Sequence, residues 1–217
     1  MVVQQIRPWY VLDDSVLDML YKIKREDFVP SENRSLAFVD MEIPLGYGQI
    51  MLAPKVEARI LQELKITKSD KILEVGSGSG YMTALLAEKG HHVYSVEILP
   101  ELKSLAEKNL KGYNIQNVTL EQGDAAQGWT KHAPYDVIAL TGSAPVLPEV
   151  CKQSLNIGGR LFAIVGEDPV MEALLITRTG LTEFTTRNFF ETSIIPLMNA
   201  HPSLTKILAR LPCSGAP

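Results

Sequence analysis

The stretch Leu73-Glu74-Val75-Gly76-Ser77-Gly78-Ser79-Gly80-Tyr81 joins an apolar segment to a glycine-rich turn. Residues 71–75 have the length of a buried strand, and a helix is predicted from about Tyr81 to Lys89. Glycines between a strand and a helix allow a sharp turn, and they let a ligand approach the backbone where a Cβ would block it. The GxGxG spacing differs from the GxGxxG of a pyrophosphate site, and no GKS or GKT is present to form a P-loop.

Two acidic residues follow the next two predicted strands. Glu97 lies near the end of the strand expected at 92–98, and Asp124 closes the strand and turn at 118–124. A carboxylate at the first place can accept both hydroxyls of an adenosine ribose, and one at the second can contact an adenine amino group. Ligands of open α/β sheets bind at the carboxyl ends of the strands, which is where these groups are predicted. NAD remains an alternative ligand at this point, with the loop spacing against it.

The segments from Pro54 onward alternate between helix and strand. Further strands are predicted at 135–142 and 158–166, and further helices from Pro54, over 100–111 and over 148–155. The segments 172–180 and 182–197 are predicted to form a closing antiparallel pair. This order predicts an α/β fold with a mostly parallel, doubly wound sheet.

The first 52 residues differ from the rest. A short helix is predicted from Asp13 or Asp14 through Lys24. The irregular stretch after it contains too many apolar residues for a solvated linker, so it is interpreted as a packed cover over one end of the domain. We expect one domain over residues 1–217, with a helix and cover segment at 1–52, a core at 53–198 and a tail at 199–217.

Composition limits the classes of function. With 217 residues, 46% of them hydrophobic, the chain is long enough for one well-buried domain. The net charge of −4 argues against nucleic acid as a partner, and the apolar stretches are too short to span a membrane. No signal peptide is recognisable, and Cys151 and Cys213 have neither disulfide nor metal spacing, which favours a reducing cytoplasm. The histidines also lack metal-ligand spacing, so no metal site is expected, and the oligomeric state stays open.

The motifs closely resemble the protein-L-isoaspartate O-methyltransferase family. The resemblance rests on LEVGSGSGYMTALLAEKG (73–90), IPLGYGQIMLAPKVEARIL (43–61) and FFETSIIPL (189–197), and extends over roughly residues 5 to 198. It implies a Rossmann-like class I methyltransferase fold that uses S-adenosyl-L-methionine and leaves S-adenosyl-L-homocysteine. The implied reaction is methylation of abnormal aspartyl carboxylates, in protein repair, with isoaspartyl-containing proteins or peptides as substrates.

The resemblance also implies two groups of site residues. The cofactor-binding group is Glu74, Gly76, Ser77, Gly78, Ser79, Gly80, Tyr81, Glu97, Ile98, Asp124 and Ala125. The substrate-binding group is Gln49, Ile50, Met51, Leu52, Pro196 and Leu197.

The sequence departs from the family where the acceptor is expected. The family commonly has a stretch like Gln-Thr-Ile-Ser-x-Pro, and Ile50 and Leu52 stand here in place of its threonine and serine. Transfer to a carboxylate that is already ionised needs no general base, so this loss weakens recognition of the acceptor without abolishing the chemistry. We hypothesise that Thr141 or Ser143 partly compensates, and no catalytic residue is assigned. Two alternatives stay open: a methyltransferase redirected to another acceptor, and a non-catalytic module that only binds the cofactor.

Overall fold

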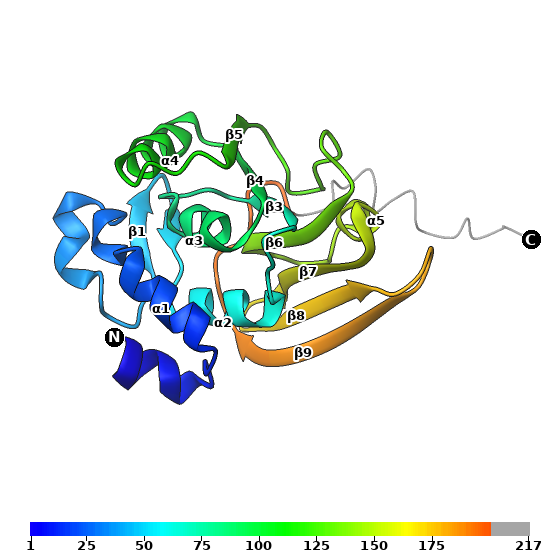
Figure 1. Ribbon diagram of the computed structural model, residues 1–217, viewed down its shortest axis with the longest axis horizontal. Helices are drawn as coiled ribbons and strands as arrows, with labels where there is room; N and C mark the ends of the chain where they lie inside the picture. The colour runs from blue at the N-terminus through cyan, green and yellow to red at the C-terminus, as the bar shows by residue number, and fades with distance from the viewer. Residues whose placement is uncertain (201–217) are drawn as a thin grey trace, which may run out of the picture.

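The computed structural model describes residues 1–200, so Cys213 and most of the tail at 199–217 lie outside the described residues. Its main element is a seven-stranded sheet in the order β5-β4-β3-β6-β7-β8-β9 (Figure 1). The strands from β5 to β7 run parallel, whereas β8 is antiparallel to both β7 and β9. The predicted mostly parallel sheet with a closing antiparallel pair is confirmed.

The elements follow the predicted ranges within a few residues. The strands of the sheet are β3 (Lys71–Val75), β4 (His92–Glu97), β5 (Val118–Gln122), β6 (Tyr135–Ala144), β7 (Leu155–Glu167), β8 (Val170–Arg178) and β9 (Phe184–Thr192). The helices are α1 (Asp14–Lys22), α2 (Pro54–Leu64), α3 (Tyr81–Lys89), α4 (Pro100–Gly112) and α5 (Glu149–Gln153). The N-terminal part adds the one-turn or two-turn helices η1 (Val2–Ile6), η2 (Arg7–Trp9), η3 (Arg25–Asp27) and η4 (Ser31–Leu36), and the hairpin strands β1 (Ile43–Gly46) and β2 (Gln49–Met51).

Several ends differ from the prediction, and the closing strand expected over 182–197 spans only Phe184–Thr192. The helix expected at 148–155 ends at Gln153, because the buried Leu155 already pairs with Tyr135 in the sheet. The first helix ends at Lys22, since Ile23 adopts an extended backbone with φ −98° and ψ 102°. The helix begins as predicted, because Asp13 is its N-cap and the Asp13 carboxylate accepts the Ser15 N–H at 2.9 Å.

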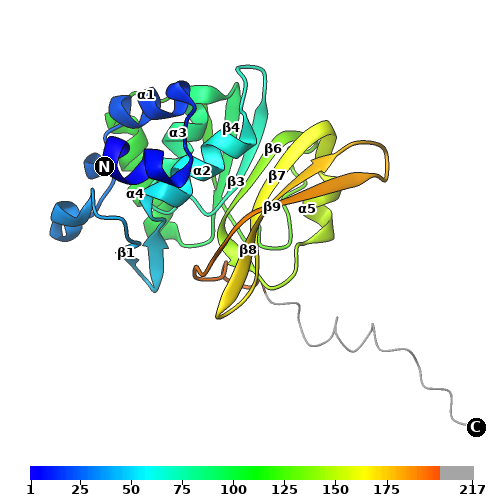
Figure 2. The same cartoon turned by 90° about the horizontal axis from the view of Figure 1, so that it is seen from below.

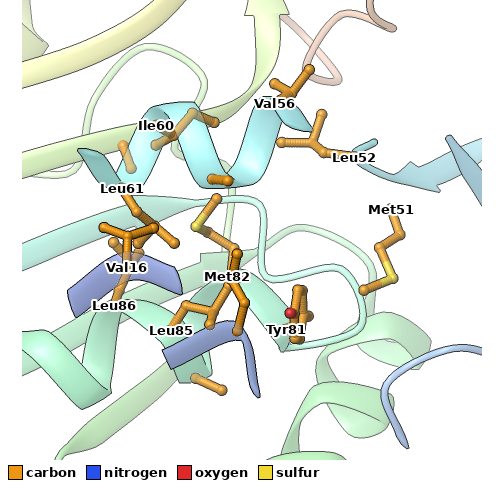
Figure 3. Packing of buried hydrophobic residues seen from close by; sticks show 14 of the residues in the cluster. Val16, Met51, Leu52, Val56, Ile60, Leu61, Tyr81, Met82, Leu85 and Leu86 are labelled. Carbon is orange, nitrogen blue, oxygen red and sulfur yellow. The ribbon is translucent and has the colours of Figure 1, made fainter. Parts of the chain in front are cut away.

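Each face of the sheet carries its own buried apolar cluster. One cluster joins sheet residues such as Ile72 and Val137 to α1, α2 and α3, which pack on one another. In Figure 3, Val16 of α1 meets Leu61 of α2 and Leu86 of α3. The cluster on the other face contains alternate sheet residues and the short helix α5. Because both faces are covered, the central strands read as nearly continuous apolar runs.

The N-terminal segment packs against the domain as expected. The β1–β2 hairpin projects beside the helices at one end of the molecule (Figure 2). The fully buried Arg25 fastens this cover, because its Nε donates to the Ala37 carbonyl at 3.1 Å and its Nη2 to the Leu52 carbonyl at 2.6 Å. Its Nη1 pairs with Glu57 of α2, so one side chain connects three separate segments.

Candidate active site

A cavity of about 790 Å³ lies at the carboxyl ends of the central strands. The glycine loop after β3 forms part of its lining. The chain continues from β3 to β4 on one side of the sheet and returns to β6 on the other, so the strand order reverses at β3. Open α/β sheets bind ligands at such a switch point. The hairpin β1–β2 and residues 195–198 form opposite walls.

The glycine loop is closely covered from both walls. Gly76, Gly78 and Gly80 have φ values of +96°, +52° and +84°, which side chains with a Cβ rarely adopt. A Cβ on Gly78 would lie 3.2 Å from Cδ1 of Leu45 in β1. A Cβ on Gly142, at the end of β6, would lie 2.9 Å from Cδ2 of Leu197. Leucine side chains of both walls therefore lie close to the backbone at this end of the sheet.

Two carboxylates line the cavity beyond the loop. Glu97 is 4% exposed, and its oxygens accept the Gly78 N–H at 2.9 Å and the Leu99 N–H at 3.1 Å. The Asp124 oxygens accept the Ala126 N–H and the Asn199 amide, each at 3.0 Å. Both acids are thus held by fixed donors at the ends of β4 and β5.

Trp129 packs against the turn that follows β5. Its indole ring packs on Gly123, where a Cβ would lie 2.6 Å from Cη2. Its Nε1 donates to Glu121 at 2.7 Å, and Glu121 also accepts hydrogen bonds from Lys131 and His132. Burial alone would raise the pKa of Glu121, but these three donors together lower it to about 2.

Glu74 lies behind the loop and is absent from the cavity lining. It is fully buried, and its Oε2 accepts from the Thr83 hydroxyl at 2.5 Å and the Ser95 hydroxyl at 2.6 Å. The Ser95 oxygen lies 2.6 Å from that of Ser77, which connects Glu74 to the loop. Burial raises the pKa of Glu74 to about 8, although both hydroxyl hydrogen bonds oppose the rise.

The segment 49–52, which the family resemblance implies to be substrate-binding, is apolar apart from Gln49. Gln49, Ile50, Met51 and Leu52 all line the cavity, as do Pro196 and Leu197 opposite. Leu52 is 4% exposed and lies beside Val56 at the start of α2, as Figure 3 shows. Of the four residues in the segment, Gln49 alone has a side chain that can donate a hydrogen bond.

The two candidate hydroxyls differ in position. Thr141 lines the cavity, and its hydroxyl oxygen lies 2.8 Å from the Val75 carbonyl and 2.7 Å from the Gly76 carbonyl. Ser143 is fully buried outside the lining and donates to the Ile194 carbonyl at 3.0 Å. Both hydroxyl protons are therefore directed at backbone carbonyls.

Most of the predicted site residues meet at this cavity, and Glu74, Gly80 and Ser143 are outside its lining. Gly80 instead packs on Ala106, whose Cα would be 3.1 Å from an added Cβ. The cavity has further lining residues that sequence reasoning missed: Leu45, Glu57, Val75, Met82, Val96, Leu102, Gly123, Ala126, Gly142, Ile195 and Met198. Glu57 had a usable signal, because a charge on the apolar face of α2, in register with Ile60, Leu61 and Leu64, indicates a buried acid.

A family model described as Protein-L-isoaspartate(D-aspartate) O-methyltransferase (PCMT) matches residues 1–201 of the chain. The chain belongs to the PCMT family. The resemblance inferred from the motifs is confirmed by this match.

Relatives and solved structures agree with this membership. A protein-L-isoaspartate O-methyltransferase of Gloeobacter violaceus is 38% identical over 205 residues, which are 93% of this chain and 98% of that protein. One from Staphylothermus marinus is 37% identical over 201 residues, covering 88% of this chain and 89% of that protein. A crystal structure of a Plasmodium falciparum PCMT with S-adenosyl-L-homocysteine has a TM-score of 0.78 at 20% identity and covers 90% of this chain and 96% of that one. The last likeness confirms the Rossmann-like class I fold.

Within residues 1–200, no helix combines the length and apolar character needed to cross a membrane. In that part of the chain, no three His, Cys, Asp or Glu side chains come together as a bound metal ion would require.

Proposed function

We propose that this chain transfers the methyl group of S-adenosyl-L-methionine to the free carboxylate of isoaspartyl residues in damaged proteins and peptides, leaving S-adenosyl-L-homocysteine. The observation that carries the proposal is the cavity at the switch point, where an intact glycine loop faces the segment 49–52. Family membership supports the same cofactor and the same class of acceptor.

The residues present fit the cofactor. Gly76, Ser77, Gly78 and Ser79 line the cavity, and the positive φ values of the two glycines let the loop turn there as a side chain with a Cβ rarely could. Gly76 to Tyr81 would hold the methionine part, Glu97 with Ile98 the ribose, and Asp124 with Ala125 the adenine. When bound, the cofactor supplies an activated methyl group on a sulfonium.

The protein contributes orientation and exclusion of water. An aspartyl carboxylate is ionised at neutral pH, because its ordinary pKa is about 4, so no side chain has to remove a proton. Ile50, Met51 and Leu52 line the same cavity as Pro196 and Leu197, and these apolar side chains would exclude water from the attacking oxygen. Gln49 is the side chain in this segment that can hydrogen-bond the acceptor.

The proposal also includes the cellular compartment and the partners of the protein. We treat residues 1–217 as one catalytic domain that works in the cytoplasm on protein and peptide substrates. The buried, unpaired Cys151 thiol is compatible with a reducing compartment. The acidic net charge of −4 supports partners other than nucleic acid.

The experiment that tests the function measures transfer of labelled methyl from S-adenosyl-L-methionine to an isoaspartyl peptide. The matched normal aspartyl peptide and a Leu52→Ser variant run beside it. We expect transfer to the isoaspartyl peptide alone, and faster transfer by Leu52→Ser, because a hydroxyl hydrogen bond to a carboxylate is worth about 1.5–3 kcal/mol. No transfer by either form, with cofactor binding intact by calorimetry, would show that the site has a different acceptor or only binds the cofactor.

A further inference from the structure

The charged residues on the cavity wall are all acidic. Of the described residues that line it, Glu57, Glu97 and Asp124 carry a negative charge, and none is Lys, Arg or His. S-adenosyl-L-methionine carries a sulfonium, an ammonium and a carboxylate, which sum to one positive charge. A wall of this composition is complementary to a ligand with cationic groups.

Two of these acids are already engaged at the ends of β4 and β5. Both Glu97 oxygens accept backbone N–H groups, and both Asp124 oxygens accept an amide donor. These positions are the ones assigned above to the ribose and the adenine. In this assignment both acids serve the nucleoside end of the cofactor, which leaves Glu57 as the acid for its amino-acid end.

Glu57 lines the cavity from α2. Its charge acts on the pKa of Tyr81, the residue that follows the glycine loop, and on that of Glu74 behind the loop. Its Oε2 pairs with Nη1 of Arg25, whose guanidinium lies 5.3 Å from the centroid of the Tyr81 ring. Among residues 1–200, no hydrogen bond reaches the second oxygen, Oε1. The carboxylate therefore has one fixed oxygen and one available for a ligand.

Arg25 holds this carboxylate without entering the cavity. Its remaining nitrogens donate to the carbonyls of Ala37 and Leu52, so the guanidinium cannot turn toward a ligand without losing these bonds. Burial raises the pKa of Glu57 to about 7, and Arg25 opposes that rise by favouring the ionised form. The ion pair thus favours the ionised form of Glu57, which burial alone disfavours.

We propose that Glu57 binds the α-ammonium group of the cofactor's methionine part through its free oxygen, and that Arg25 is a positioning residue that keeps this carboxylate in place. The inference rests on the proposed function, because it uses the placement of the cofactor in the glycine loop. Glu57 would recognise the positive charge of the α-ammonium group, and the buried Arg25–Glu57 ion pair would take part in cofactor binding.

The test compares three ligands by calorimetry. S-adenosyl-L-homocysteine is measured beside its deamino analogue, in which hydrogen replaces the α-amino group, and beside 5′-methylthioadenosine, which lacks the amino-acid part. The proteins are the natural chain, Glu57→Gln and the control Glu63→Gln. Glu63 suits the comparison because it lies on the same helix and pairs with Arg59 at 3.0 Å, outside the cavity lining.

The expected result is a loss of discrimination in one variant. The natural chain and Glu63→Gln should bind S-adenosyl-L-homocysteine about tenfold or more tightly than the deamino analogue, as for a charged hydrogen bond. Glu57→Gln should bind the two nearly alike and bind 5′-methylthioadenosine as the natural chain does. If Gln prevents folding, Glu57→Asp keeps the charge and should show a smaller preference, because its carboxylate is one methylene shorter.

Other outcomes overturn the proposal. Equal weakening of S-adenosyl-L-homocysteine and its deamino analogue in Glu57→Gln would mean that the ion pair serves the fold alone. An unchanged preference for the amino group in that variant would assign the ammonium to another residue. If the natural chain binds none of the three ligands, the proposed function itself fails, and this inference fails with it.

Discussion

The hydroxyl oxygen of Thr141 on β6 lies 2.7 Å from the carbonyl oxygen of Gly76, the first residue after β3. The contact is so close that a Cβ on Gly76 would collide with the same hydroxyl. Thr141 also bonds the Val75 carbonyl at 2.8 Å, so one side chain fixes the direction in which the chain leaves the strand. The geometry of the cofactor loop thus depends on its neighbouring strand.

Gly76→Ala should therefore weaken cofactor binding strongly. An alanine at this position is disfavoured by the φ of +96° and by the collision of its Cβ with Thr141. Backbone strain of this kind costs about 1–3 kcal/mol, which corresponds to a loss of roughly 5- to 150-fold in affinity. Calorimetry with S-adenosyl-L-homocysteine measures the effect. Gly158→Ala is the matched control, since its φ is +84° but nothing lies within 4 Å of the added Cβ. Equal affinities in the two variants would contradict the role given to the contact.

Thr141→Val should lower cofactor affinity, whereas Thr141→Ser should preserve it. Valine keeps the shape but leaves two loop carbonyls without their donor, a loss of about 1–3 kcal/mol. The hypothesis that Thr141 compensates for Leu52 predicts a further change: KM for an isoaspartyl peptide should rise more than Kd for the cofactor. Ser143→Ala, whose hydroxyl bonds Ile194 outside the cavity lining, should lower Tm and leave both constants unchanged. Steady-state kinetics and thermal unfolding separate these cases.

Glu97→Gln should reduce the affinity for S-adenosyl-L-homocysteine by about 10- to 150-fold. The Glu97 carboxylate accepts hydrogen bonds from two backbone N–H groups, whereas the glutamine amide would place its own NH₂ group against one of these donors. The glutamine also lacks the negative charge that strengthens hydrogen bonds to hydroxyl groups. The exposed Glu101→Gln on the neighbouring α4 is the control and should bind as the natural chain does. Calorimetry on both variants checks the expectation, which would be wrong if their affinities agreed within twofold.

Glu74 should make the protein less stable as the pH rises. Its pKa is about 8 in the folded protein and near 4.5 when exposed, so between these values the folded state binds more protons than the unfolded state. The free energy of unfolding then falls with rising pH over this window, by up to about 1.4 kcal/mol per pH unit. Glu57, with a pKa of about 7, adds a slope of the same sign.

Replacing Glu74 isolates its share of that slope. Glu74→Gln cannot titrate, so its stability should depend less on pH than that of the natural chain between pH 5 and 8. Urea unfolding at several pH values gives both curves, and the exposed Glu107→Gln on α4 serves as the control. Parallel curves for the natural chain and Glu74→Gln would rule out the proposed protonation.

Local patterns predicted the order of elements well. The apolar runs at 71–75 and 135–142 became central strands, and Pro54 begins α2 where its fixed φ suits the first helical turn. The glycine loop was recognisable because its residues are consecutive in sequence and its spacing is typical of a ligand site. The segment 49–52 has no such spacing, and its predicted role was implied by the family resemblance alone.

Long-range pairing accounts for what the sequence did not predict. Glu57 reaches the cavity as a charged group because Arg25, from a separate helical turn, accompanies it into the core. The hydrogen bonds from Thr83 and Ser95 that hold Glu74 behind the loop come from α3 and β4. These partners are neighbours only in the folded chain, so periodicity and motif spacing cannot predict them.

The attachment of residues 195–198 has a consequence for synthesis. Ser143 on β6 donates its N–H to Ile195 at 3.0 Å and accepts the Leu197 N–H at 2.9 Å, which places Leu197 over Gly142. Ribosomes make the glycine loop long before this last wall, and domains fold as their chains emerge. A growing chain can therefore complete most of the sheet while its cavity is still open on one side. Capture of the cofactor in its enclosed form therefore has to wait until residues 195–198 have been added to the chain.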